Sequence, residues 1–226
     1  MMEDINLVEG LGWYAAFLLS VVLHEAAHAW SALKLGDPTA YHGGQVTLDP
    51  IPHIQREPFG MVIIPLVSFI LGGWMVGWGS TPYDPHWALN NPKRSAWMAL
   101  AGPAANLLLM IVAGILMRIG LATGIFSFGG IGVTSADQVA WLSGTATFLS
   151  ILFLLNLILL IFNLLPVPPL DGSALPLLGM DRQMAHRYMN FLYHPNMRWI
   201  GIIIAWNVFG QIFDHVAPWV MSIFFG

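Results

Sequence analysis

The sequence contains no cysteine, which excludes disulfides, a thiolate nucleophile, an iron–sulfur cluster and a cysteine-bound zinc ion. Any metal ion must therefore be held by His, Asp or Glu. Charged residues are also scarce: they make up 9% of the 226 residues, whereas soluble domains contain roughly a quarter. With eight Lys and Arg and a formal net charge of -4, the chain offers no basic patch, so we expect no nucleic-acid partner.

Hydrophobic residues make up 57% of the chain and occur in long continuous blocks. A soluble domain would instead carry its apolar residues in short amphipathic runs. Four blocks reach the length of about 20 residues that a helix needs to cross a bilayer. They are residues 11–35, 95–117, 142–166 and 199–225. The sequence thus predicts an all-α polytopic membrane protein, a bundle of about four to six transmembrane segments in one domain that fills residues 1–226.

The segments between these blocks are less regular. An apolar stretch at 59–78 is interrupted by a proline and a Gly-Gly pair, which indicates a possible re-entrant segment rather than a simple span. The polar stretch 42–57 contains a short alternating run at 45–48, which predicts a membrane-associated strand or hairpin. The glycine-containing stretch 124–137 predicts a loop.

The first apolar block contains the run His24-Glu25-Ala26-Ala27-His28. Because the two histidines are four residues apart, both imidazoles lie on one helical face and can bind the same metal ion. Glu25 projects next to them and can act as the base for a metal-bound water. Ionisable side chains cost about 3 kcal/mol or more each at membrane depth, so they mark function more often than simple packing.

A catalytic zinc ion generally takes a third protein ligand. Asp171 is the best candidate, because it follows an uncharged apolar block and a proline cluster that ends the helix. An acid at such a break faces protein or a cavity rather than lipid, although an Asp that caps a turn is the ordinary alternative. Glu57 and His53 are the other candidates, and Glu57 is more simply explained as a solvated loop residue.

Three motifs, in this order, resemble the site-2 protease family of intramembrane zinc metalloproteases. They are His-Glu-Ala-Ala-His at 24–28, Ala-Gly-Pro-Ala-Ala-Asn at 101–106 and Asn-Leu-Leu-Pro-Val-Pro-Pro-Leu-Asp-Gly at 163–172. The chain is most similar to the compact prokaryotic type that lacks a PDZ insert. Ser80-Thr81-Pro82 departs from the Lys-Pro pair that such proteins tend to have, and Ser173-Ala174 departs from their Gly-Arg, which leaves substrate preference open.

The resemblance implies that His24, His28 and Asp171 bind one zinc ion per chain and that Glu25 is the general base. It also implies that Asn163 lies beside the metal, where it contacts the scissile carbonyl or the oxyanion. The helix that begins at Gly102 is expected to pack against the catalytic helix, because small residues let membrane helices approach closely. For Asn106, a packing role and a catalytic role remain equally open.

The predicted function is hydrolysis of peptide bonds within or near the transmembrane segments of membrane-protein substrates, in a lipid bilayer. Because a helix hides its peptide bonds, the substrate must unwind locally before water attacks, and the run 45–48 offers an edge for the extended segment. The alternative is a non-proteolytic zinc-binding membrane protein, such as a transporter or a regulator with a degenerate protease site. Glu25 favours the protease, because transport requires ligands but no base.

The positions of the basic residues predict the orientation. The three motifs meet only if blocks 11–35 and 142–166 end, and block 95–117 begins, on the same side of the membrane. All Lys and Arg except Arg118 then share that side: Lys34, Arg56, Lys93, Arg94, Arg182, Arg187 and Arg198. By the positive-inside rule this side is cytoplasmic, so we expect the site to lie toward the cytoplasm of a prokaryotic cell. The same orientation places the amino terminus outside. The first ten residues contain no Lys or Arg, so we expect no signal peptide.

Overall fold

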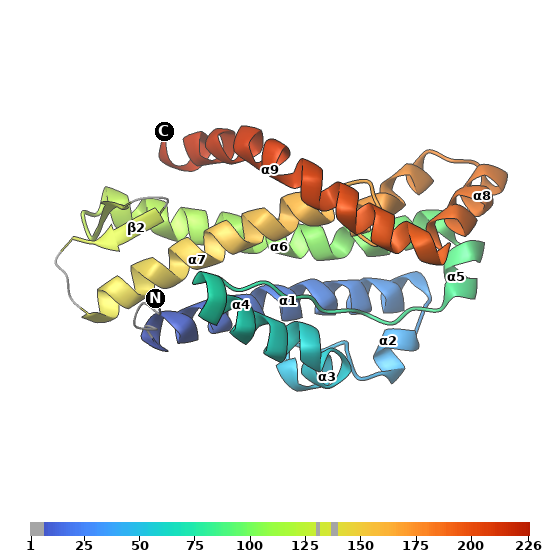
Figure 1. Cartoon of the computed structure of the whole chain (residues 1–226), viewed down its shortest axis with the longest axis horizontal. Helices are drawn as coiled ribbons and strands as arrows, with labels where there is room; N and C mark the ends of the chain where they lie inside the picture. The colour runs from blue at the N-terminus through green and yellow to red at the C-terminus, as the bar shows by residue number, and fades with distance from the viewer. Residues whose placement is uncertain (1–6, 130–131, 137–139) are drawn as a thin grey trace.

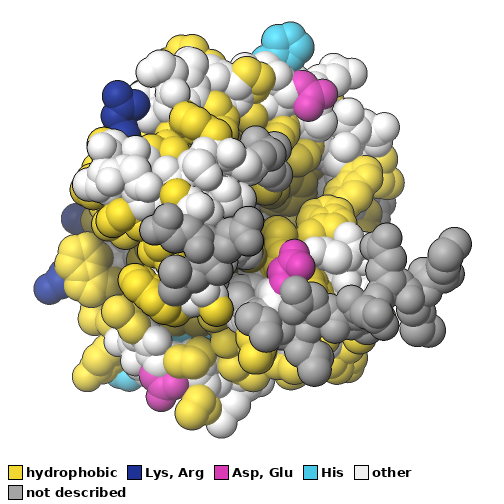
Figure 2. Space-filling view, turned by 90° about the vertical axis from the view of Figure 1, so that its left-hand side faces the viewer, with side chains coloured by type: hydrophobic (Ala, Val, Ile, Leu, Met, Phe, Trp, Pro, Cys, Tyr) yellow, Lys and Arg dark blue, Asp and Glu magenta, His cyan; other side chains and the backbone are white. Residues whose placement is uncertain are grey.

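A computed structural model describes residues 7–129, 132–136 and 140–226 of the chain. The acidic residues Glu3 and Asp4, and the last residue of the expected 124–137 loop, lie outside this part. The described residues form a helical bundle with one small hairpin, so the predicted all-α polytopic fold is confirmed. Figure 2, which views the molecule from the end that carries the hairpin, shows mostly hydrophobic side chains and few charged ones.

Four helices in the described part are long and apolar enough to cross a membrane. They are α1 (Leu7–Leu35), α6 (Pro92–Ala122), α7 (Ala140–Asn163) and α9 (Pro195–Phe225). Their ends differ from those of the predicted blocks by at most five residues: α7 ends three residues earlier than predicted, and the other three helices are longer than their blocks. The hydrophobic blocks therefore located the spans correctly.

Helices α1, α6 and α7 pack closely on one another and form the centre of the bundle, while α9 lies along one side (Figure 1). Glycines on α6 permit this packing. Gly102 faces α1, and Gly114 faces the Phe224 ring of α9 with the Phe153 ring of α7 beside it, in each case too closely to admit a methyl group. Small residues at such crossings let van der Waals contact replace lipid, which is the main attraction between helices in a membrane.

The directions of the four long helices determine which of their ends lie near one another. Helices α1 and α7 end, and α6 and α9 begin, at the end of the bundle that carries the short helices α5 (Pro85–Asn90) and α8 (Arg182–Leu192) (Figure 1). This is the arrangement that the orientation argument required, because it brings the three sequence motifs together.

The predicted strand at 45–48 is wrong. Residues 43–49 are turns and bends between two short helices, α2 (Thr39–His42) and α3 (Pro50–Arg56). The Asp49 side chain caps α3 by accepting from the Ile51 amide at 3.0 Å, and proline at the first helical position favours a helix start. The run is too short, and no described strand pairs with it.

The apolar stretch 59–78 reverses direction instead of crossing the bundle. It consists of the π-helical turn η1 (Phe59–Ile63) and α4 (Ile64–Gly72), and its chain turns back at Gly73, whose φ is +73°. The returning chain is extended, and the Trp78 amide donates to the Gly60 carbonyl at 3.1 Å. Both ends of the stretch therefore lie side by side, which matches the re-entrant form of the prediction.

The loop expected at 124–137 is also partly wrong, because it contains the hairpin. Strands β1 (Phe126–Gly129) and β2 (Gly132–Ser135) pair in antiparallel fashion, with Phe126 opposite Ser135. Aromatic and β-branched residues in both runs favour extended structure, and the buried Phe126 ring packs against Gly120 of α6. The sequence-based interpretation gave too much weight to the glycines that surround these strands.

Candidate metal centre and active site

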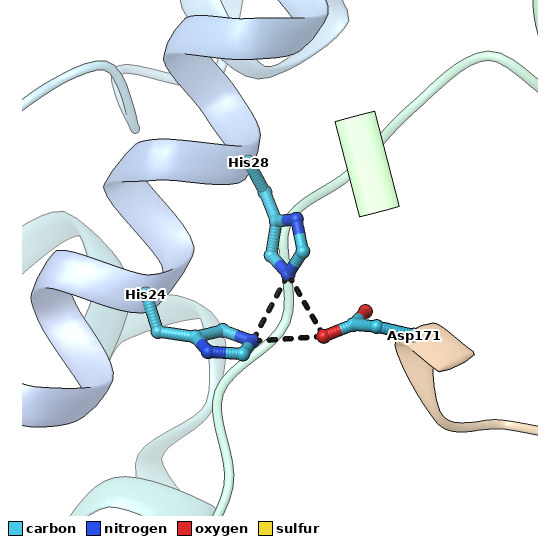
Figure 3. Close-up of side chains that lie close together, drawn as sticks. All are labelled: His24, His28 and Asp171. Atoms are coloured by element: carbon cyan, nitrogen blue, oxygen red, sulfur yellow. Dashed lines mark hydrogen bonds and ion pairs between the residues drawn. The ribbon is translucent and has the colours of Figure 1, made fainter. Parts of the chain in front are cut away.

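His24 and His28 project from the same face of α1 toward Asp171, the first residue of the 3-10 helix η2 (Asp171–Leu178) that follows α7 (Figure 3). The two Nε2 atoms are 3.0 Å apart. Asp171 Oδ2 lies 3.2 Å from Nε2 of His24 and 3.3 Å from Nε2 of His28. The structure thus brings together the three ligands that the sequence predicted, and in the described part of the chain they form the one cluster with metal-ligand geometry.

The Nδ1 atom of each imidazole makes a hydrogen bond to an oxygen. Nδ1–H of His24 donates to Asn106 Oδ1 at 2.6 Å, and Nδ1–H of His28 donates to the Met98 carbonyl at 2.8 Å. Both acceptors come from α6. Since each neutral imidazole carries one proton, Nε2 of both rings is left with a free lone pair. Asn106 therefore does more than bond across helices, because it holds a predicted metal ligand in the orientation that binding requires.

Three electron-pair donors consequently point at one spot. Asp171 Oδ2 is buried and accepts no hydrogen bond. Donors bonded to zinc at about 2.1 Å with tetrahedral angles lie about 3.4 Å apart, close to the separations seen here. The site fits a zinc ion.

Gly102 makes this convergence possible. A Cβ atom at this position would lie 2.3 Å from Nε2 of His28 and 2.5 Å from Nε2 of His24. Those distances resemble a bond to a metal more than a nonbonded contact, so only a glycine leaves room for the ion. The small residue in the second motif is therefore required by the metal site as well as by helix packing.

Glu25 is buried beneath the extended chain that returns from Gly73. The Thr81 hydroxyl donates to Glu25 Oε2 at 2.8 Å and also lies 2.9 Å from the Glu25 backbone carbonyl. A Cβ at Gly79 would lie 2.7 Å from Glu25 Cγ, so the chain passes directly over this side chain. Thr81 was not found from the sequence as a site residue, because its partner is 56 positions away and no local pattern links them.

The competing ligand candidates lie elsewhere. Glu57 accepts from the Ser80 hydroxyl at 2.5 Å, and that hydroxyl in turn accepts from Arg56 at 3.1 Å. His53 is buried in α3, where its Nε2 lies 3.1 Å from the Thr47 carbonyl. Neither residue belongs to the metal cluster formed by the described residues.

Asn163 is the last residue of α7 and is partly buried. Its side chain makes no hydrogen bond with the described residues, so its place beside the oxyanion stays a prediction. The same helix carries Asn156, a buried amide that the sequence-based analysis did not consider. An uncharged amide within an apolar span is the sequence signal that could have identified it.

Comparison with known proteins places this site in a family. The model of Peptidase family M50, the site-2 protease family, matches residues 13–206 and so includes all three motifs. The chain belongs to peptidase family M50. This M50 chain is also similar to proteins whose names describe them as zinc metalloproteases.

One such relative is YwhC of Bacillus subtilis (strain 168), which is 35% identical over 156 residues, 69% of this chain and 63% of the relative. Another is Rip2 of Mycolicibacterium smegmatis, 32% identical over 158 residues, 70% of this chain and 53% of the relative. Rip2 of Mycobacterium tuberculosis is 32% identical over 160 residues, 71% of the M50 chain and 54% of that protein. The matches thus span between half and two thirds of these relatives. No solved structure matches the chain significantly.

Proposed function

We propose that this M50 family member is an intramembrane zinc metalloprotease that hydrolyses peptide bonds within or near transmembrane segments. One observation supports this more than any other: two imidazole lone pairs and a carboxylate converge beside a buried glutamate, inside a bundle of apolar helices. A transporter or a metal-dependent regulator would need the three ligands. It would not need Glu25 held in place by a hydrogen bond from Thr81.

In this proposal His24, His28 and Asp171 hold the ion and leave one position open for water and the substrate carbonyl. Zinc supplies Lewis acidity, which lowers the pKa of a bound water and stabilises negative charge on the carbonyl oxygen. Glu25 accepts the proton of the attacking water and passes it to the leaving amide nitrogen. Asn163 is proposed to stabilise the oxyanion from the end of α7.

An apolar groove lies along α1, the helix that carries two of the proposed ligands. It has a volume of about 300 Å³ and lies between α1, α6 and the irregular segment 45–48. Its lining is almost entirely apolar: Leu23, Ala26, Ala27, Trp30, Val46, Thr47, Leu48 and Ala105.

The backbone of segment 45–48 can contribute to binding even though it is not a strand. The amide and carbonyl groups of Val46 and Leu48 make no hydrogen bond with the described residues, while both side chains line the groove. Free backbone groups along a groove can pair with the main chain of an extended peptide. We therefore propose that an extended part of the substrate lies along Val46–Leu48, with apolar side chains facing α1.

The proposed membrane is the prokaryotic cell membrane, with the site toward the cytoplasm. Lys34 lies in the last turn of α1, and Lys93 and Arg94 lie in the first turn of α6. Arg182 and Arg187 belong to α8 at the same end of the bundle, which by the positive-inside rule faces the cytoplasm (Figure 1).

The test uses the purified chain in proteoliposomes with a model transmembrane peptide and measured zinc content. Wild type should cleave the peptide, and Glu25→Gln should lose activity by orders of magnitude while keeping its zinc, because the ligands remain in place. Wild-type turnover by Glu25→Gln would show that Glu25 is not the base. A zinc-loaded wild type that transports zinc and cuts no peptide would favour the transporter.

A further inference from the structure

Asn156 lies in the middle of α7 and is fully buried, as are Asn106 of α6 and Ser20 of α1. The proposed mechanism does not use Asn156 or Ser20. A carboxamide buried at membrane depth must satisfy its two donors and its acceptor within the protein. The way in which Asn156 does so links three helices to the metal site.

The orientation of the Asn156 amide is fixed by two groups that act as hydrogen-bond acceptors toward it. Its Nδ2 donates to the Leu152 carbonyl at 2.8 Å and to Ser20 Oγ at 2.8 Å. The Ser20 hydroxyl uses its own proton toward the Ala16 carbonyl at 2.7 Å, so toward Asn156 it is an acceptor. Reversal of the Asn156 amide would place an oxygen against a carbonyl oxygen. Oδ1 of Asn156 must therefore face away from both, toward α6.

That oxygen then fixes the next amide. Asn106 Nδ2 donates to Asn156 Oδ1 at 2.8 Å and, at the longer distance of 3.4 Å, to the Ser20 carbonyl. This leaves Asn106 Oδ1 directed at His24 Nδ1, 2.6 Å away. A reversed Asn106 would present an N–H donor to Nδ1 and would favour the other tautomer of His24. In that tautomer the proton is on Nε2, where it blocks the lone pair that faces Asp171.

We propose that Asn156, supported by Ser20, is a positioning residue that holds His24 in its metal-binding tautomer through Asn106. The proposal rests on the proposed zinc site. His28 needs no such support, because its Nδ1–H donates to the Met98 backbone carbonyl, which cannot reverse. Loss of Asn156 therefore weakens one ligand and leaves the other two unchanged.

Asn156→Leu removes the closer of the two acceptors that orient Asn106 and leaves only the Ser20 carbonyl at 3.4 Å, with little change in side-chain volume. Zinc affinity should fall about 10- to 100-fold, the usual effect of losing an outer-shell partner of a metal-bound histidine. Asn156→Asp with a protonated carboxyl can donate to Leu152 and accept from Asn106, so it should recover most of the affinity. In the cobalt-substituted protein, the visible absorption spectrum should change in Asn156→Leu and return in Asn156→Asp.

Asn207→Leu is the matched control. Asn207 of α9 donates to the Ile203 carbonyl at 2.7 Å, the same bond to the preceding turn that Asn156 makes, but it is exposed and shares no hydrogen bond with Asn156, Asn106 or Ser20. This variant should bind zinc like wild type. Helix content and thermal unfolding of the metal-free proteins report whether each variant folds.

The outcomes separate the two proposals. A wild-type protein that does not bind zinc would overturn the proposed function. If wild type binds zinc and Asn156→Leu binds it equally well with the same cobalt spectrum, the positioning role is wrong. It is also wrong if zinc affinity falls only in proportion to lost folded protein, or if Asn156→Asp restores stability without restoring affinity, since both results describe a packing residue.

Discussion

Gly102→Ala should abolish high-affinity zinc binding although it changes no ligand. The added methyl carbon would lie 2.3 Å from His28 Nε2 and 2.5 Å from His24 Nε2, whereas an ordinary contact is at least 3.4 Å. Relieving the closer contact, from 2.3 Å to 3.4 Å, requires α1 and α6 to separate by about 1.1 Å at this crossing. Metal sites tolerate errors of about 0.2 Å in their bond lengths, so the ligand set cannot close around the ion.

The magnitude follows from the ligands that the shift displaces. Both histidines come from α1, and both Nδ1 atoms are held by α6, so separation of these helices strains two of the three ligands together. We expect zinc affinity to fall at least 100-fold, which corresponds to about 2.7 kcal/mol. Proteolytic activity should be lost in parallel at limiting zinc.

The assay is competition for zinc with a chelator of known affinity, on detergent-solubilised protein. Gly144→Ala is the control, because a Cβ at Gly144 in α7 meets nothing within 4 Å. It should bind zinc normally and gain up to about 1 kcal/mol of helix stability. Stoichiometric zinc of wild-type affinity in Gly102→Ala would refute the placement of the ion between the two imidazoles and this glycine.

Three further results are expected. Asp171→Ala should reduce zinc occupancy, measured by elemental analysis, because only two protein ligands remain; full occupancy would show that another side chain is the third ligand. Thr81→Val should lower kcat several-fold without loss of zinc, since the base loses its hydrogen bond, and Thr81→Ser should restore it; an unchanged kcat would make the contact incidental. Single cysteines at the exposed positions Gln55 and Asn90 should label from one face of sealed vesicles, and a cysteine at Ser127 from the other. Labelling of Gln55 and Asn90 from opposite faces would show that 59–78 is an ordinary span.

The parts of the site that the sequence predicted are those with a local signal. His24 and His28 were recognisable because a helix places residues four apart on one face. Asp171 was recognisable because a charge beside a long uncharged span needs a partner. The reversal at 59–78 was predicted from the Gly-Gly pair and from the requirement that the motifs meet.

The features that were missed depend on contacts between distant segments. Thr81 and Asn156 contact the site only after distant segments of the chain have packed together. Neither residue belongs to a local sequence motif that marks it as part of a site. The run 45–48 alternates like a strand, but a strand needs a partner, and the cap at Asp49 starts a helix instead. Glycines around 126–135 obscured a hairpin for which the aromatic residues were the better guide.

The division of the ligands between α1 and η2 has a consequence for biogenesis. Two ligands are present once α1 has been made, but the third, Asp171, follows 143 positions after His28, beyond the span α7. A partly synthesised chain therefore has only two of the three donors and cannot hold the ion firmly. Once α7 and Asp171 are in place, zinc at a concentration 1,000 times its dissociation constant raises the free energy of unfolding of the bundle by about 4 kcal/mol. Completion of the helical bundle and completion of the zinc site are thus the same step.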